Sequence, residues 1–405
     1  MKIRNRKGSV TVFLMVFFVS LVLGLQIFIH QSEKLAVKGI CESVNSVIAQ
    51  SLLGEYDLHL RERYGIFGFP GPESEINRKC SFYAKEAFRG KSKIHFEKGN
   101  CKVAEYSLCN TALFKKQIIE ESKSETLKHP VTIKEKEEMQ EESSGEQKEG
   151  FIKNQAVLYY LPSNGTEKKF FTGNLGSLMK KGSLKEVLEH AGDRALILNY
   201  IQHYFKSAHG ETNPGKTFFR YEQEYFVCGK FSDRENRKGI RNRIISLREV
   251  SNYGFLRKDP EKSAMVLAAA ELLTPGPAAA ATAEGLFASW ALAESVNDYK
   301  LLVNGHKVPA VKTPDMWAVD LESVINNEEK GCIFTGKDRG ESYEDYISVF
   351  LSAMDEHLLL LRIMDLIQIN MKYLYYDDFL LADYYGGITA GFTVNGVDYE
   401  LDKEY

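Results

Sequence analysis

The nine histidines are the first side chains to consider for chemistry, because imidazole binds metals and titrates near neutral pH. None of them lies in an H-E-x-x-H motif or in a close set of histidine and carboxylate ligands. The densest group is Asp355-Glu356-His357, which falls in a predicted amphipathic helix and is interpreted as part of its solvated face. No G-x-S-x-G nucleophile motif and no phosphate-binding loop are expected.

Basic side chains concentrate on a helix that is predicted to begin at the capping sequence Ser232-Asp233-Arg234-Glu235. They are Arg234, Arg237, Lys238, Arg241, Arg243 and Arg248. Such a cluster could bind an acidic partner or an anionic lipid. The preferred interpretation is a solvent-exposed face whose charge is balanced by nearby Glu222 and Glu224.

The overall composition narrows the class of protein further. A net charge of −3 gives no reason to expect nucleic-acid binding. A hydrophobic fraction of 44% is ordinary for a globular protein, so a packed core is expected. Because the sequence also lacks the catalytic and metal-binding motifs considered above, we predict a protein that is not an enzyme, with no catalytic, cofactor-binding or metal-binding residue, no cofactor and no small-molecule substrate.

The six cysteines are even in number, and they are expected to form disulfides only in an oxidising compartment. Cys101 and Cys109 are the best candidates for a local disulfide. The alternative is that several cysteines are free and serve as small, buried apolar residues. No C-x-x-C motif occurs, which argues against a zinc site.

The most distinctive element near the N-terminus is an uncharged apolar segment, residues 9–29. At about 1.5 Å per residue this segment spans roughly 30 Å, the thickness of the hydrocarbon core of a bilayer. The leader, residues 1–8, carries four basic side chains, so the N-terminus is expected in the cytoplasm and the rest outside the cell. A cleaved secretory signal is the alternative, but the apolar run is too long and lacks an Ala-x-Ala site.

The helical pattern continues beyond the membrane segment as an amphipathic stalk over residues 30–54. Apolar side chains recur at three- and four-residue steps from Leu35 to Leu52, and Gly54 is the predicted stop. The apolar face of this stalk is expected to pack against the rest of the chain or against a partner helix.

The remainder of the chain is divided into three parts. Residues 55–114 are predicted to form a small α+β unit, with two strands within residues 92–107. Residues 151–405 are predicted to form the main α+β extracytoplasmic domain. Residues 115–150 are dominated by Glu, Lys, Gln and Ser, so they bury too little apolar surface to offset their ordering entropy. We interpret them as a solvated helix that leads into a disordered linker, with a specific acidic binding tail as the alternative.

Within residues 151–405 the periodicities predict mostly helices. Residues 217–229 are the strongest strand candidate, because they are rich in aromatic residues and carry charges on one face. Helices are predicted from Ser232 to about Val250, with Val250 buried, and for about 30 residues from a capping sequence at Ser342. Near the C-terminus, Asn395-Gly396 between alternating segments predicts a β-hairpin.

Two further helices are predicted at residues 261–273 and 278–303. A membrane hairpin is one interpretation of this pair, but Glu271, Glu284 and Glu294 interrupt it, so packing in a soluble bundle is preferred. The predicted fold class is therefore α+β. A long N-terminal transmembrane and stalk helix is followed by a mixed, mostly helical extracytoplasmic region with small antiparallel sheets.

The leader Lys7-Gly8-Ser9 and the helix after it resemble TadE/TadG-like proteins of type IVb (Tad/Flp) pilus systems. The signature of these pilin-like proteins includes a glutamate five residues after the glycine, and Phe13 stands at that position here. The departure favours an accessory protein over a subunit of the filament.

Several stretches resemble an uncharacterised clostridial family, the domain of unknown function 5702. They are residues 7–14, 53–67, 222–253, 290–313, 342–351 and 362–370. The resemblance implies a membrane-anchored, extracytoplasmic accessory protein of a Tad/Flp-type pilus or related secretion apparatus, with the membrane and other pilin-like proteins as partners. The rival hypothesis is an ectodomain that binds or hydrolyses envelope polymers. A stalk laid against a sheet favours the first, whereas a deep polar cleft with paired carboxylates favours the second.

Overall fold

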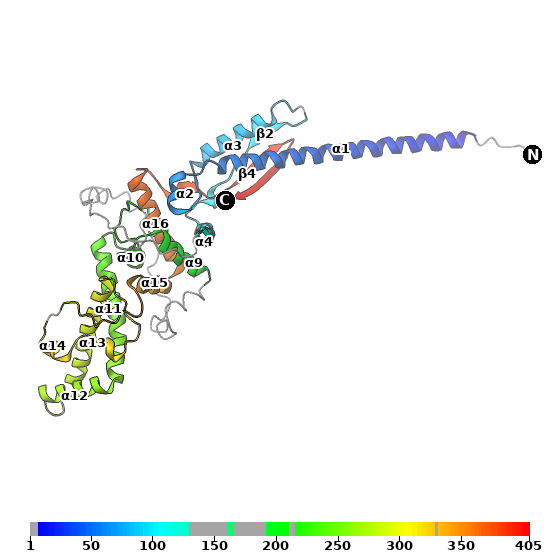
Figure 1. Ribbon diagram of the computed structural model, residues 1–405. Coiled ribbons are helices and arrows are strands. Elements are labelled where there is room, and N and C mark those ends of the chain that lie inside the picture. Colours follow the sequence, from blue (N-terminus) through cyan, green and yellow to red (C-terminus); the bar gives the residue numbers. More distant parts are fainter. Residues whose placement is uncertain (1–6, 92, 129–159, 165–191, 210–214, 329–330) are drawn as a thin grey trace, which may run out of the picture. The chain divides into compact units, whose positions relative to one another are not determined.

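The computed structural model describes residues 7–91, 93–128, 160–164, 192–209, 215–328 and 331–405. The fold is α+β, as predicted, with many helices and two small antiparallel sheets (Figure 1). The chain divides into two compact units. Unit 1 consists of Met1–Leu58, Phe67–Asn110 and Ala382–Tyr405, and unit 2 consists of His59–Ile66 and Thr111–Leu381.

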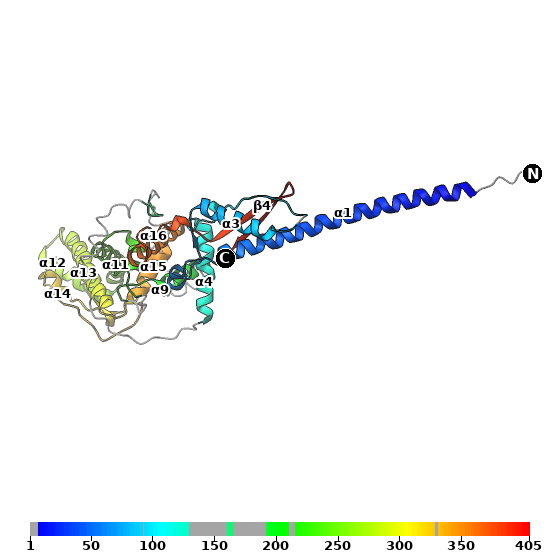
Figure 2. The same cartoon turned by 90° about the horizontal axis from the view of Figure 1, so that it is seen from above.

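Unit 1 is built on α1 (Lys7–Leu53), a single continuous helix of 47 residues. Its other elements are β1 (Phe69–Pro70), α3 (Glu73–Phe88), β2 (Phe96–Gly99), the 3₁₀ helix η1 (Ala104–Tyr106), β3 (Tyr384–Tyr385), β4 (Gly387–Val394) and β5 (Val397–Glu404). The main sheet is antiparallel in the order β2-β4-β5, while β1 pairs with β3. In both views the C-terminal half of α1 lies beside α3 and β4 (Figures 1 and 2).

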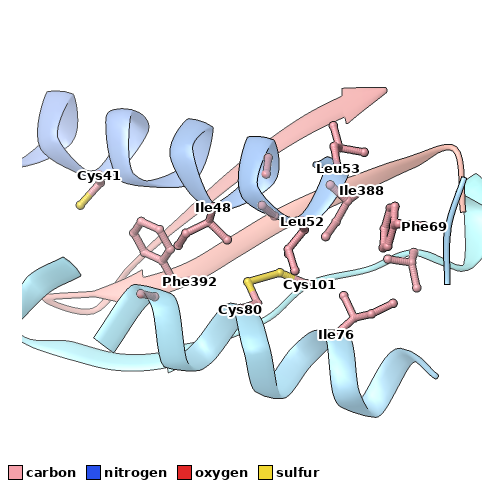
Figure 3. Close-up of a cluster of buried hydrophobic side chains, with 14 of the residues drawn as sticks. Cys41, Ile48, Leu52, Leu53, Phe69, Ile76, Cys80, Cys101, Ile388 and Phe392 are labelled. Carbon is pink, nitrogen blue, oxygen red and sulfur yellow. A yellow bond between two sulfur atoms is a disulfide. The ribbon is translucent and has the colours of Figure 1, made fainter. Parts of the chain in front are cut away.

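The core of unit 1 lies between α1, α3 and the sheet. Ile48 and Leu52 of α1 point toward α3 and the sheet, where they meet Ile76 and Phe392 (Figure 3). All four side chains are at most 2% exposed. Burying a side chain of this size contributes about 1.5–3 kcal/mol, so this contact fixes the stalk to its unit.

One disulfide is present among the described residues, and it joins Cys80 of α3 to Cys101, which follows β2 (Figure 3). The predicted pairing of Cys101 with Cys109 is therefore wrong, and the Cys109 side chain is half-buried outside the disulfide. The partner of Cys101 is set by the packing of α3 on β2, which brings residues 21 positions apart together. Spacing along the sequence carries no information about that packing.

The C-terminal hairpin is confirmed. β4 and β5 pair in register from Val394 opposite Val397, and the turn residues Asn395 and Gly396 have φ values of 53° and 73°. These left-handed conformations are the ones that a two-residue hairpin turn requires. A second strand was also expected within residues 92–107, beside β2. The 3₁₀ helix η1 stands there instead, and Lys102 makes only an isolated bridge with Thr389.

Unit 2 is helical in the residues that the structure describes. Its helices are α2 (Leu58–Tyr64, from His59 onward), α4 (Thr111–Lys128), α9 (Asp193–Tyr204), α10 (Glu222–Cys228), α11 (Asp233–Lys258), α12 (Pro260–Leu273), α13 (Ala279–Val303), α14 (Leu321–Ile325), α15 (Tyr343–Ala353) and α16 (Glu356–Leu374). The longest, α11 and α13, pack against each other, and α12 packs on α13. The predicted helices at 261–273 and 278–303 are thus confirmed.

The strand predicted at residues 217–229 is wrong, because its second half forms α10. Every residue of α10 is buried, so no polar face marks it as a helix in the sequence. It ends at Gly229, whose φ of 63° is the left-handed conformation typical of a helix C-terminus. Alternation of aromatic and charged residues was therefore a misleading signal for a helix that is covered on all sides.

Two helices differ in extent from their predictions. The helix after Ser232 runs to Lys258 rather than Val250, and Val250 is 76% exposed instead of buried. The capping box at Ser342 is confirmed, but the predicted helix of about 30 residues breaks in two. Asp355 interrupts it, since its carboxylate accepts a hydrogen bond from Leu358 N (2.9 Å) and starts α16 as a new N-cap.

The segment at residues 115–150 begins inside α4. Its first residues are helical, as the sequence indicates, but Ile118 is fully buried and Glu121 is 7% exposed, so this part is packed rather than solvated. The linker and the acidic-tail alternative predicted for the remainder fall on residues 129–150, outside the described residues.

Candidate functional site

The first half of α1 carries the most distinctive surface of unit 1. Within the described residues, α1 is the one helix long and apolar enough to cross a membrane, judged by its length and composition. Its apolar side chains from Val10 to Ile29 are exposed, with fractions from 43% to 74%. A row of uncovered apolar side chains of this length matches the thickness of a bilayer.

The second half of α1 has two faces. On one face Cys41, Ile48 and Leu52 are buried against the sheet and α3, and Asn45 Nδ2 donates a hydrogen bond to Tyr399 O (3.1 Å). On the other, Val47 is 61% exposed. The helix thus joins an uncovered apolar segment to a firmly packed one without a break.

In unit 2, α10 holds two carboxyl groups that have no solvent exposure, Glu222 and Glu224. Glu222 accepts hydrogen bonds from Asn370 Nδ2 (2.7 Å) and Lys206 N (3.0 Å). Glu224 accepts from Ala208 N (2.9 Å) and from the hydroxyl of Tyr343 (3.0 Å). Burial raises the pKa of each group to about 7, because the charged form loses its hydration.

These carboxyl groups titrate near neutral pH, which is a property of many general acids and bases. Their burial keeps any substrate away from them, and their partners are backbone and side-chain groups of unit 2 itself. We therefore assign Glu222 and Glu224 a role in holding α10 in place. The prediction that they balance exposed basic residues is wrong, because both face inward.

A second buried polar group, the charge cluster of Arg248, Asp298, Glu294 and Lys312, ties α11 to α13. Arg248 Nε donates to Asp298 Oδ2 (2.9 Å), and Lys312 Nζ lies 2.5 Å from Asp298 Oδ1. Burial alone would raise the pKa of Asp298, but the two cations outweigh it and hold that pKa below its usual range. Arg248 belongs to this cluster and not to the exposed basic face on which the sequence placed it.

Arg243 is half-buried and donates to Cys228 Sγ (3.2 Å) and Gly239 O (3.2 Å), so it does not belong to the exposed face either. The other four basic side chains predicted there do lie at the surface. Arg234, Arg237, Lys238 and Arg241 are exposed, and together we call them the basic face. They line a pocket of about 820 Å³ with Arg220, Tyr221, Asp233 and Tyr299. The sequence indicated the four α11 residues through their spacing. It gave no signal for Tyr299, which reaches the pocket from α13.

The other residues considered for chemistry have structural contacts. Asp355 caps α16, and Glu356 pairs with Lys115 (2.8 Å), while His357 is exposed. No group of metal-ligating side chains occurs among the described residues. Glu294 of α13, whose charge argued against a membrane hairpin, is fully buried in the charge cluster.

Residues 210–217 read GETNPGKT, which fits the spacing of a phosphate-binding loop, and this motif was missed in the sequence. Such a loop must follow a strand and open a helix. Here the element before it is the helix α9, and residues 215–220 are not helical. Residues 210–214 lie outside the described part of the chain. The described context therefore does not support a nucleotide site at this motif.

Comparison with known proteins gives one match. A model for a family of unknown function, DUF5702, matches residues 119–396. No curated protein and no solved structure matches the chain.

Proposed function

The chain belongs to the family of unknown function DUF5702, and from this premise we propose that it is a single-pass membrane protein acting through protein–protein contacts. Its partners would be pilin-like components of a Tad/Flp-type pilus or related secretion apparatus. The observation that carries the proposal is α1, in which an exposed apolar segment continues directly into a stalk packed on a sheet. That arrangement favours a structural role over an enzymatic one.

The proposed orientation has the leader in the cytoplasm and both units outside the cell. The basic leader supports it, since positive residues flanking a membrane helix stay on the cytoplasmic side. The Cys80–Cys101 disulfide supports it independently, because disulfides persist in oxidising compartments.

The proposed contact with partners runs along the stalk. Leu35 is 69% exposed and Val47 is 61% exposed, although each lies in the same helix as buried apolar residues. Exposed apolar side chains on a helix beside a membrane are suited to packing against a second helix of similar design. The resemblance to TadE/TadG-like proteins makes a pilin-like helix the expected partner.

The orientation is tested with the native thiol of Cys332, which is exposed in unit 2. A membrane-impermeant maleimide should label Cys332 in intact cells, and Cys332→Ser should remove that label. Asn5→Cys in the leader, combined with Cys332→Ser, should be labelled only after lysis. Labelling of Cys332 only after lysis would reverse the proposed orientation.

The partner contact is tested with Val47→Glu, which places a charge in the proposed helix–helix interface. The matched control is Gln50→Glu, an equal change of charge at an exposed polar position of the same helix. After crosslinking in membranes, Val47→Glu should lower recovery of proteins with a basic leader and an apolar N-terminal helix by about tenfold or more. Equal recovery with both variants would contradict the proposal.

The accessory role is tested by mass spectrometry of the mature N-terminus. An intact Met1 is expected for an anchor that the prepilin peptidase does not process. A chain that begins at Ser9 would instead indicate processing as a filament subunit, despite Phe13.

A further inference from the structure

The basic face repeats along two turns of α11. Arg234, Arg237, Lys238 and Arg241 occupy positions i, i+3, i+4 and i+7, which project from one side of a helix. At 1.5 Å per residue the four cations extend over about 10 Å. Like charges at such spacings destabilise a helix by a few tenths of a kcal/mol per pair. A cluster of this kind is stabilised when an anion binds it.

Two tyrosine rings hold the guanidinium groups at this pocket. The Cζ atom of Arg241 lies 5.9 Å from the ring centroid of Tyr299, and that of Arg220 lies 5.7 Å from the ring centroid of Tyr221. Tyr299 is only 8% exposed, so it is a fixed wall rather than a mobile side chain. An arginine placed against an aromatic ring, as Arg241 is, keeps its N–H groups directed outward, where they are available for an anion.

The pocket is not neutralised by the carboxylates around it. Asp233 is the one acidic residue among its lining side chains, and its oxygens accept hydrogen bonds from Arg220 N (3.1 Å) and Tyr221 N (3.2 Å). Glu222 and Glu224 on the next helix are buried on its inner side. Within the part of the chain that the structure describes, no residue of the basic face forms an ion pair with a carboxylate.

We propose that the pocket formed by the basic face, Tyr221 and Tyr299 binds an anionic ligand that carries two or more phosphate groups within about 10 Å. Arginine binds phosphate oxygens through two parallel N–H groups, and one phosphate would engage only part of a row of four cations. A nucleic acid fits less well. Each tyrosine ring already has a guanidinium group over one face, and Tyr299 is only 8% exposed, which leaves little ring surface for base stacking. This inference does not depend on the proposed pilus function.

The test uses the full chain in nanodiscs of phosphatidylcholine, with tripolyphosphate as the probe and calorimetry as the readout. Two variants remove charge from the pocket, Arg237→Gln/Arg241→Gln and Arg234→Gln/Lys238→Gln. The matched control, Lys258→Gln/Lys262→Gln, removes two cations from the same unit outside the pocket. Both pocket variants should weaken binding about tenfold or more, while the control should change it less than about twofold. Thermal unfolding of each variant shows that it is folded.

Two further binding experiments distinguish a lipid headgroup from a soluble phosphate compound as the ligand. Co-sedimentation with vesicles of cardiolipin, whose headgroup carries two phosphates, tests lipid headgroups, and inorganic phosphate tests a single anion. Loss of tripolyphosphate or vesicle binding in the pocket variants supports the proposal and identifies the source. The proposal is overturned if neither probe binds, if inorganic phosphate binds as tightly as tripolyphosphate, or if the control variant loses as much binding. Tighter binding of single-stranded DNA at the same pocket would replace it with a nucleic-acid site.

Discussion

The two units differ in what fills their interiors. The core cluster of unit 1 is made of apolar side chains and cysteines from α1, α3 and the sheet. Among the described residues, every buried charged side chain lies in unit 2. These residues are Glu121, Glu222, Glu224, Arg248, Glu294, Asp298, Lys312, Arg362 and Asp365.

The two interiors should respond differently to mutation and to pH. Apolar burial is nearly independent of pH and tolerates substitutions of similar volume. Buried charges require every partner, because an unpaired ion in a protein interior costs several kcal/mol. We therefore expect unit 1 to be sensitive to reduction of its disulfide, and unit 2 to be sensitive to pH and to the loss of single charges.

The largest effect is expected from Arg248→Met, which removes the cation that pairs with buried Asp298. The carboxylate would keep Lys312 but lose the hydrogen bond from Arg248 Nε, and the free energy of unfolding of unit 2 should fall by about 3–5 kcal/mol. Hydrogen exchange of the full chain, followed by mass spectrometry, measures this in peptides of α11 and α13. Peptides of β4 in unit 1 are the internal reference. A loss below about 1 kcal/mol would mean that the charge cluster is dispensable.

The next effect is expected in unit 1, from Cys80→Ala/Cys101→Ala. The disulfide closes a loop between residues 21 positions apart, and its removal should cost about 3 kcal/mol by freeing the unfolded chain. The same exchange experiment should show faster exchange in α3 and β4, with α11 unchanged. Cys109→Ala, at a cysteine outside the disulfide, is the control and should leave both units unchanged. Equal destabilisation of unit 2 would show that the two units unfold together.

A third prediction concerns pH and Glu224. Its pKa is about 7 in the folded protein and near the ordinary value of 4.5 when unfolded, so the folded state binds more protons between these values. The resulting stabilisation is complete below pH 4.5 and is lost as pH rises through 7. Raising the pH from about 5 to about 8 should cost unit 2 about 2 kcal/mol through this group.

Glu224→Gln should remove that part of the pH dependence, because the neutral amide resembles the protonated acid. Denaturant unfolding at pH 5 and pH 8 measures how steeply the free energy of unfolding depends on pH. Glu400→Gln, at an exposed position in unit 1, is the control. An unchanged slope in Glu224→Gln would place the titrating group elsewhere.

The sequence predicted the elements whose signals are local. The membrane-length helix, the capping box at Ser342 and the Asn395-Gly396 turn each depend on residues a few positions apart, and the structure contains all of them. α10 was predicted as a strand because its burial on every side erased the helical period. The break at Asp355 was missed because the apolar pattern continues through it.

The contacts that form the disulfide and the basic pocket could not be predicted from the sequence, for a different reason. Cys80 meets Cys101, and Tyr299 meets Arg241, only after separate helices have packed. The same holds for the burial of Glu222, which appeared in the sequence as a charge near a basic helix. Charge counted along the chain cannot distinguish a carboxylate that neutralises a surface from one that faces the core.

The smallest effect tests whether polar contacts matter in unit 1 at all. Asn395 has a left-handed backbone (φ 53°), and its side chain accepts from His95 N (2.9 Å) and donates to Lys93 O (3.0 Å). Asn395→Gly relieves the backbone but loses both hydrogen bonds, whereas Asn395→Ala loses both and adds strain. We expect a loss of about 1 kcal/mol or less for glycine and about 1–2 kcal/mol for alanine, with no dependence on pH. Hydrogen-exchange rates of the β4–β5 hairpin, corrected for the intrinsic exchange rate at each pH, measure the stability of both variants above and below pH 7. A loss of 3 kcal/mol or more with glycine would mean that unit 1 also depends on a polar network, because solvent-exposed hydrogen bonds contribute less than this.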